Sequence, residues 1–334
     1  MVEVSPGARP LTDVALVAEY PWRYGGSQRL LHVLARAWDK PIYLLPPAEP
    51  GSIVWNTPTT IAVPDEPVLL SIVVDGFQPR LVPGKKHIKF CHSRSTIDRY
   101  WRDSRLEAVE FLTHRPRVRD HYRRLGLSMT CIPDGYIPYD GVHSAERADE
   151  QETACCVTSR LSPDKVPLAF VAALRELPYT TYLVGSQEDQ EHASAVRTMT
   201  NGLSRVAVIE PDQHGGGISV QATYLRRSKI LVHYATGGFK DHLEYGILDA
   251  LVAGVVPVCV TPDPAQFDVI ESERLGRVVT GVEQLPAAVD DALRNHEAHR
   301  AAAADFMAGF TSGQPSMLRR WRRTVGTLVD TMRS

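Results

Sequence analysis

The feature that most constrains the fold of this 334-residue chain is a regular alternation of short apolar runs with segments of helical spacing. The apolar run at 13–20 is followed by a segment with helical periodicity at 25–38 and by a second apolar run at 41–45. Further strand-like runs follow at 68–76, 87–92 and 108–114. Strand-length runs that are joined through helices predict parallel sheets covered by helices.

The alternation is interrupted once, between residues 138 and 153, by a polar, charged stretch with few large apolar residues. Such a composition is typical of a linker between domains. A second alternating series then runs to about residue 261, and the chain ends in an amphipathic helical pattern at 315–333. A chain of this length suits two domains of roughly 150 residues each. We therefore expect two doubly wound α/β domains, at 1–145 and 146–314, with a cleft between them.

Composition narrows the class of protein without naming a partner. The formal net charge is only −2. No apolar run reaches the roughly 18 residues of a membrane span, and the N-terminus lacks the basic-then-apolar pattern of a secretory signal. The five cysteines lie mainly in apolar runs, and the adjacent pair Cys155–Cys156 lacks metal-ligand spacing. Reduced core thiols and a cytoplasmic location are the expectation.

The motif TSRLSPDK, Thr158 to Lys165, places two cations on a predicted strand-to-helix turn. Such turns form the ligand edge of an open α/β sheet. Arg160 offers a fork of donors and Lys165 a point charge, so together they could hold a diphosphate. Two solvated surface cations would give the same spacing, and the spacing alone leaves both interpretations open.

The stretch FKDHLEYGILDALVAGVVPV, Phe239 to Val258, combines acids with an apolar helix and strand. Gly246 lies near the predicted helix start, where free N–H groups and the helix dipole favour an anion. Asp241 and Glu244 would repel a phosphate, so they are better suited to accept hydrogen bonds from sugar hydroxyls. Asp249, about a turn into the helix, could take two ribose hydroxyls. The alternative is that Asp241 and Glu244 are ordinary helix-start acids that complement the dipole.

The first domain offers weaker signals. In YPWRYGGSQRLL, Gly25 and Gly26 stand between a strand and a helix, where glycines let the backbone approach a ligand. A lone Gly-Gly pair is a weak signal, because a plain turn explains it nearly as often. His92, in KFCHSRS, ends a predicted strand. A histidine there can belong to a ligand site or have only a structural role.

The order of the motifs resembles that of the retaining GT-B glycosyltransferases of family 4. The motifs are, in order, GGSQRLLHVLA, TSRLSPDKVPLAFVAALRELP, YLVGSQED and DHLEYGILDALVAGVVPV. The resemblance spans most of the chain and is strongest at 155–260. It implies the GT-B fold, with two Rossmann-like doubly wound domains facing a central cleft. It also implies a C-terminal helix, at 315–334, that crosses back to the first domain.

The resemblance also implies roles in the second domain. Arg160 and Lys165 match the arginine and lysine that bind the donor diphosphate. Asp241 and Asp249 match a Glu-x7-Glu motif whose first acid contacts the donor sugar and whose second contacts the ribose. The backbone amides between them would reach the distal phosphate; these belong to Leu243, Glu244, Tyr245 and Gly246.

In the first domain, the resemblance places Gly25 and Gly26 near the phosphates and acceptor, and His92 near the donor sugar. Glu244 departs from the family, which usually has a small or apolar residue there. That departure leaves open whether Asp241 or Glu244 faces the sugar. The aspartates at both motif positions are also shorter than the usual glutamates.

The activity implied is transfer of a hexosyl or pentosyl group from a UDP- or GDP-type sugar to a hydroxyl, with retention of configuration. No cofactor is implied, and the absence of an Asp-x-Asp motif agrees with a metal-independent site. A sugar-nucleotide epimerase and a non-catalytic sugar-nucleotide-binding protein are the alternatives.

A cation-rich region at 85–124 is the candidate for acceptor binding, and Tyr100, Trp101 and Tyr122 are interleaved in it. It could meet an anionic lipid head group, with a peripheral membrane location. It could equally meet nucleic acid, including a modified DNA base as for phage-type enzymes. A solvated helix pair is the third interpretation, because acids offset part of the charge. The cations are Lys85, Lys86, Lys89, Arg94, Arg99, Arg102, Arg105, Arg115, Arg117, Arg119, Arg123 and Arg124.

Overall fold

The computed structural model describes most of the chain, in twelve stretches. These are 13–18, 30–31, 34–35, 40–46, 59–73, 81–91, 109–132, 152–187, 189–210, 217–236, 243–312 and 314–333. The described residues form two compact units. The first unit contains the residues up to 132 and those from 312 onward, and the second contains 152–236 and 243–311.

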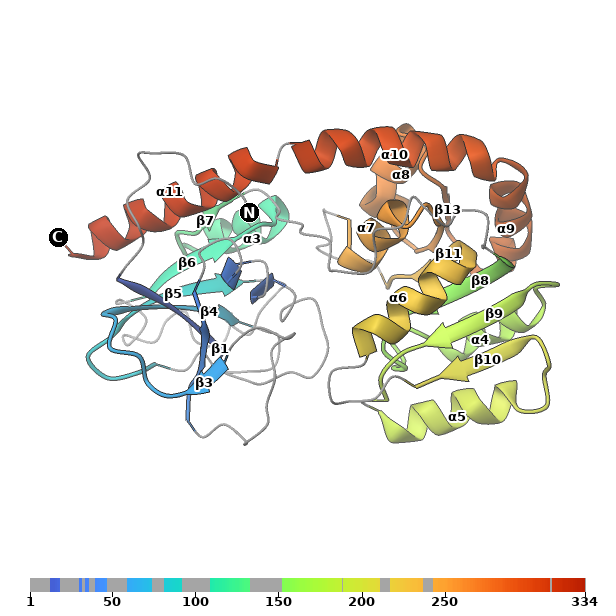
Figure 1. Cartoon of the computed structure of the whole chain (residues 1–334), viewed down its shortest axis with the longest axis horizontal. Coiled ribbons are helices and arrows are strands. Elements are labelled where there is room, and N and C mark those ends of the chain that lie inside the picture. Colours follow the sequence, from blue (N-terminus) through green and yellow to red (C-terminus); the bar gives the residue numbers. More distant parts are fainter. Residues whose placement is uncertain are drawn as a thin grey trace. The chain divides into compact units, whose positions relative to one another are not determined.

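The first unit is built on a seven-stranded parallel sheet (Figure 1). Its strands are β1 (Val14–Ala18), β2 (Ile42–Leu44), β3 (Thr59–Ile61), β4 (Val68–Val73), β5 (Lys86–Cys91), β6 (Val109–Thr113) and β7 (Thr130–Cys131). Their order is β3-β2-β1-β4-β5-β6-β7. The chain therefore builds outward from β1 in one direction and then reverses at β4, as in a doubly wound sheet.

Successive residues of each strand face opposite sides of this sheet, so the two faces have separate cores. One face includes Phe90 and is covered by the C-terminal helix α11 (Gln314–Arg333). The Trp321 ring stacks on Phe90 with a centroid separation of 5.3 Å, and Val325 and Val329 join the same core. On the other face, α3 (Pro116–Arg124) buries Val118 and Tyr122.

The interior of the first sheet also contains a lysine. Lys89, in β5, is completely buried, and its Nζ donates a 2.8 Å hydrogen bond to Oγ of Ser71 in β4. Burial lowers the pKa of Lys89 to about 7, because an ammonium group is costly to remove from water.

The second unit is built on a six-stranded parallel sheet. Its strands are β8 (Glu152–Thr158), β9 (Thr180–Val184), β10 (Val206–Ile209), β11 (Ser228–Tyr234), β12 (Val256–Val260) and β13 (Arg277–Val279). Their order is β10-β9-β8-β11-β12-β13, so the direction of building reverses between β8 and β11. The carboxyl ends of β8 and β11 therefore flank the crevice in which ligands of such sheets bind.

Helices cover both faces of the second sheet (Figure 1). α4, α5 and α9 share one apolar core with the strands, whereas α6 and α7 pack on the opposite face. The helices are α4 (Leu168–Arg175), α5 (Gln190–Thr200), α6 (Gly217–Arg227), α7 (Tyr245–Val252), α8 (Asp268–Ser272), α9 (Leu285–Arg294) and α10 (His296–Ser312), with 3-10 turns η3 (Pro264–Phe267) and η4 (Val282–Gln284). Among the described helices, none is long and apolar enough to cross a membrane.

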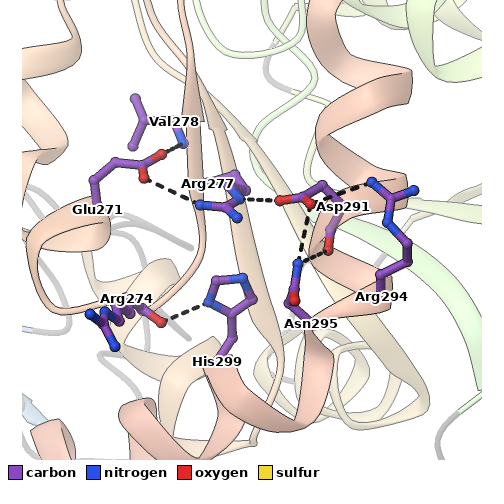
Figure 2. A network of polar contacts seen from close by, with 8 residues as sticks. All are labelled: Glu271, Arg274, Arg277, Val278, Asp291, Arg294, Asn295 and His299. Carbon is purple, nitrogen blue, oxygen red and sulfur yellow. Dashed lines mark hydrogen bonds and ion pairs between the residues drawn. The ribbon is translucent and has the colours of Figure 1, made fainter.

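The edge strand β13 is held by a polar network rather than by a broad apolar face (Figure 2). Arg277 pairs with Glu271 of α8 and with Asp291 of α9, while Glu271 accepts a 2.7 Å hydrogen bond from the amide of Val278. The hydrogen bond from Arg277 holds the pKa of Asp291 below its ordinary value. Polar side chains thus fix a short strand whose own residues are only partly buried.

Candidate functional site

The candidate site lies at the carboxyl edge of the second sheet, where β8 and β11 run side by side. The loop after β8, residues 159–166, leads toward α4. The connection after β11 leads to α7. Because the two connections leave neighbouring strands in opposite lateral directions, their residues are brought to one crevice although they are distant in sequence.

The loop after β8 has a fixed frame. Leu161 and Val166 are both fully buried in the apolar core of the unit. They alternate with the two cations singled out in the sequence, Arg160 and Lys165. The buried anchors therefore hold the backbone of both cations at the edge of the sheet.

A glycine lets this loop lie against the end of β9. A Cβ atom added to Gly185 would lie 1.6 Å from the carbonyl oxygen of Ser159, so no other residue fits at this position. The amide of Leu161 donates to the carbonyl of Ser186 at 2.9 Å, which joins the two loops. The close approach explains why a glycine follows the strand in YLVG.

Lys165 and Glu244 form an ion pair across the crevice. Nζ of Lys165 lies 3.2 Å from Oε2 and 3.4 Å from Oε1 of Glu244. The side chains are 16% and 21% exposed, so the pair is largely removed from water. The contact joins positions 79 residues apart in the sequence.

His233 is a third member of this cluster, and sequence reasoning did not single it out. It is the penultimate residue of β11, is 6% exposed, and places Nε2 3.6 Å from Oε2 of Glu244. Its ring packs edge-on against Phe267 with a centroid separation of 5.8 Å. Within the described part of the chain, Nε2 has no hydrogen-bond partner. The sequence does contain one signal for His233. It is a histidine near the end of an apolar strand, and strand ends form the ligand edge of such a sheet.

The start of α7 faces the end of β8. Glu244 is the N-cap residue, but its side chain makes no capping hydrogen bond, and the first turn contains no acidic residue. A Cβ atom added to Gly246 would lie 3.6 Å from Oγ1 of Thr158, in ordinary contact. The positive end of the helix dipole is therefore directed to the same crevice as Lys165. Asp249, in the second turn, is 4% exposed.

Arg160 is placed differently from Lys165. It pairs with Asp164 at 3.6 Å, and the two side chains are 43% and 55% exposed. Partial burial by itself raises the pKa of Asp164, but the hydrogen bond from Ser162 and the charges of Arg160 and Lys165 outweigh it, so that the pKa is lowered. The guanidinium is accessible to a ligand.

The structure thus brings together Lys165 and the start of α7, where Leu243 precedes Glu244 and Tyr245 and Gly246 follow it, with Arg160 on the same loop as Lys165. Asp249 is one turn further along α7, and the other predicted site residues lie outside the described residues. These are Gly25, Gly26, His92 and Asp241.

The expected cation-rich surface at 85–124 is smaller than the sequence indicates. Lys89 is completely buried, Arg115 is 6% exposed, and Tyr122 is completely buried, so none of the three can meet a partner. Both faces of β5 are covered, so Lys89 is buried whichever face it occupies, and the helical period of α3 turns Tyr122 to the core. The exposed cations that remain on α3 are Arg117, Arg123 and Arg124. Residues 92–108 of this region lie outside the described part.

The histidine, cysteine and acidic side chains of the described residues are not clustered as metal ligands. Within the described stretches, no group of three histidine, cysteine, aspartate or glutamate side chains is arranged to hold a metal ion. All five cysteines are free thiols, and four of them are buried. The polar groups at the crevice are therefore a lysine, an arginine, carboxylates, a histidine and backbone amides.

No protein-family model matches this sequence, and no curated protein matches it. Solved structures do match it in fold. AviGT4, a glycosyltransferase involved in avilamycin A biosynthesis, has a TM-score of 0.62 at 18% identity, covering 95% of this chain and 98% of its own. Anabaena Alr3699/HepE in complex with UDP and glucose has a TM-score of 0.66 at 11% identity, covering 95% and 99%.

The trehalose-6-phosphate synthase OtsA has a TM-score of 0.58 at 11% identity, covering 97% of this chain and 99% of its own. Likenesses at such low identity establish architecture, and here they extend over nearly the whole length of each chain. The chain therefore has the fold of the GT-B glycosyltransferases, with two parallel-sheet α/β domains.

Proposed function

We propose that this protein is a glycosyltransferase that moves a sugar from a nucleoside-diphosphate donor to a hydroxyl, with retention of configuration. One observation carries the proposal. At the switch point of the second sheet, Lys165 and the start of α7 meet at the carboxyl ends of β8 and β11. A cation beside a helix N-terminus is suited to a phosphate group.

The proposed roles in the second unit follow from charge. Arg160 and Lys165 hold the diphosphate, and the amides between Leu243 and Gly246 receive its distal phosphate. These groups stabilise the charge that develops on the leaving group, which is the main electrostatic demand of the reaction. Asp249 takes the ribose hydroxyls, and Asp241 takes the donor sugar.

The roles proposed for the first unit rest on the motif order alone. Gly25 and Gly26 are assigned to the phosphates and acceptor, and His92 to the donor sugar. In the reaction, the bond between the anomeric carbon and the phosphate oxygen breaks, and a bond to the acceptor oxygen forms on the same face. The departing phosphate oxygen takes the proton of the acceptor hydroxyl. No metal or cofactor is required in this scheme.

The acceptor is proposed to be a hydroxyl compound with anionic character. The observation in favour is the group of exposed arginines on α3, Arg117, Arg123 and Arg124. Asp120 offsets part of their positive charge. A lipid-linked glycan at a cytoplasmic membrane surface and a hydroxylated DNA base both offer phosphates beside a hydroxyl. Transfer assays with each class decide between them.

A thermal-shift titration with UDP, GDP, ADP, CDP and dTDP tests the donor site. UDP comes first, because the structure of the Anabaena protein contains UDP and glucose. A nucleotide that binds only the folded state raises the melting temperature. Arg160→Ala and Asp249→Ala are each expected to weaken binding by about 1–3 kcal/mol, the range of charge-assisted hydrogen bonds. Unchanged affinity in both folded variants would contradict the proposal.

A non-catalytic nucleotide-binding protein is the second candidate. The observation that favours it is the pairing of Lys165 with Glu244, because a cation that already has a carboxylate is less available to a phosphate. Binding of the nucleotide without hydrolysis or transfer of the sugar would support it. Formation of an isomeric sugar nucleotide without any acceptor would instead indicate an epimerase.

A further inference from the structure

Glu244 is in an unusual position for a carboxylate. It is the N-cap residue of α7, two residues before Gly246, which lies against Thr158 at the end of β8, where the proposed donor phosphates would bind. Its oxygens lie 3.2 and 3.4 Å from Nζ of Lys165, at the distance of a direct charge-assisted hydrogen bond. The carboxylate therefore accepts the hydrogen bonds of the Lys165 ammonium group that a phosphate oxygen would otherwise accept.

A second group could take over this carboxylate. Nε2 of His233 lies 3.6 Å from Oε2 of Glu244, slightly beyond hydrogen-bond distance. His233 is more than nine-tenths buried, and its Nε2 has no hydrogen-bond partner among the described residues. A small movement of either side chain would form an imidazolium–carboxylate pair. A histidine can change its charge between about pH 5 and pH 8, so it can supply the required proton.

We propose that Glu244 is a built-in competitor for the diphosphate, and that diphosphate binding transfers its carboxylate from Lys165 to a protonated His233. This inference rests on the proposed function. Without the ligand, Lys165 and Glu244 neutralise each other, and Nε2 of His233 lies beyond hydrogen-bond distance of the carboxylate. With the ligand, Lys165 pairs with the phosphate, and His233 takes up a proton to neutralise Glu244. Donor binding is thereby coupled to proton uptake.

Two neighbours of His233, Cys259 and Phe267, do not compete for this proton. Cys259 lies beside it in the sheet, and burial raises the pKa of the Cys259 thiol, with the charges of Glu244 and Glu271 raising it further. The thiol therefore stays neutral near physiological pH. From η3, the ring of Phe267 carries no charge. The charged groups on the neighbouring elements are Asp249, a buried acid of α7, and Lys165, the cation of the facing loop.

The test compares UDP binding to the wild type and to Glu244→Gln from about pH 6 to pH 8.5. Glu244→Gln is expected to bind UDP about tenfold more tightly at about pH 7, because a carboxylate no longer competes for Lys165. The ratio of the two affinities is expected to grow by about tenfold per pH unit above that, since one proton is linked to binding. Titration of UDP itself affects both proteins equally and cancels in the ratio.

His233→Asn tests the proton acceptor separately. It is expected to bind UDP at least tenfold more weakly than the wild type near pH 6, and this difference is expected to shrink by up to tenfold per pH unit above about pH 7, because proton uptake by the wild type becomes more costly as the pH rises. In Glu244→Gln, the same change at position 233 is expected to have no effect, which a purely structural role of His233 would not produce. Equal weakening at every pH would overturn the role given to His233.

Glu152→Gln is the matched control, because it also removes one carboxylate from an ion pair in the second unit. Glu152 starts β8, so it lies ~20 Å from the crevice, at about 3.3 Å per residue along the strand. It is expected to leave UDP affinity unchanged within about twofold. An equal gain in Glu152→Gln and Glu244→Gln would show a general charge effect and overturn the proposal.

Calorimetry of UDP binding to the wild type measures the number of protons taken up per UDP bound, so it tests the inference even if the variants do not fold. At about pH 8 the phosphates of UDP are already deprotonated. Titrations in two buffers with different ionisation enthalpies are expected to show net proton uptake, and zero uptake would overturn the inference. If neither the wild type nor Glu244→Gln binds UDP, GDP or inorganic pyrophosphate, the proposed function itself fails. Binding with parallel pH profiles overturns the inference alone.

Discussion

The two sheets of this protein share the same strand order around their first strand but place charge in opposite ways. In the first sheet, Lys89 is buried at the centre, beside Ser71. In the described strands of the second sheet, no lysine, arginine, aspartate or glutamate is buried. There the charged groups stand at the carboxyl edge, in the loops that carry Lys165 and Glu244. Topology creates a crevice, and the residues at the strand ends decide what it can bind.

The strongest test of this comparison concerns the aromatic pair in the first unit. Trp321→Ala is expected to lower the free energy of unfolding by about 3–5 kcal/mol, because it empties a fully packed site against Phe90. Hydrogen exchange should rise in peptides from β4 and β5. Trp321→Phe is the matched control, and its free energy of unfolding should fall much less. Equally faster hydrogen exchange in β8 and β11 would contradict the view that the two sheets have independent cores.

The buried lysine predicts a pH dependence that belongs to the first unit. The pKa of Lys89 is lowered to about 7 in the folded state, whereas an ordinary lysine titrates near about 10.4. Above about pH 7 the unfolded state binds more protons than the folded state, so the free energy of unfolding rises with pH by up to about 1.4 kcal/mol per unit. Below about pH 7, the full cost of burying the ammonium remains.

Lys89→Met is expected to remove this rise, which amounts to about 2–3 kcal/mol between about pH 7 and pH 9. Urea unfolding of both proteins at several pH values measures it, with reductant present to protect the thiols. Parallel pH profiles of wild type and variant would show that Lys89 does not control the stability. Lys85→Met is a suitable control, because the Lys85 side chain makes only an exposed hydrogen bond, to the carbonyl of Asp65, among the described residues.

At the edge of the second sheet, Lys165→Ala is expected to weaken nucleoside-diphosphate binding by about 1.5–3 kcal/mol, the cost of losing a hydrogen bond to a charged group. The variant also leaves Glu244 without its cation, which adds repulsion toward the phosphate. Isothermal titration with UDP gives the affinity. A folded Lys165→Ala that binds as well as the wild type would remove Lys165 from the site.

The smallest effect is expected for the exposed pair on the same loop. Asp164→Asn removes the partner of Arg160, but both side chains are well exposed, and such pairs contribute about 0–1 kcal/mol. The melting temperature and the UDP affinity should therefore change little. A large change would mean that Asp164 organises the loop through Ser162, whose hydroxyl donates to it at 2.7 Å.

Several elements of both sheets could be predicted from hydrophobic periodicity, and the structure confirms them. β3 (Thr59–Ile61) and β13 (Arg277–Val279) were not identified, because they are short edge strands whose residues are intermediate or exposed. An edge strand pairs on one side only and needs little apolar surface, so it leaves a weak signal in the sequence. The network around Arg277, which fixes β13, is equally invisible to periodicity.

The sequence by itself determined the alternation of strands and helices and the placement of Arg160, Lys165 and Gly246 on strand-to-helix turns. Only the tertiary structure decided which of these residues meet. Lys165 reaches Glu244 because β8 and β11 pair side by side, which brings together positions 79 residues apart. The same pairing adds His233, and the cover on both faces of β5 buries Lys89. Local spacing fixes which side of an element a residue occupies, whereas strand pairing fixes its neighbours, and neighbours determine the chemistry of the site.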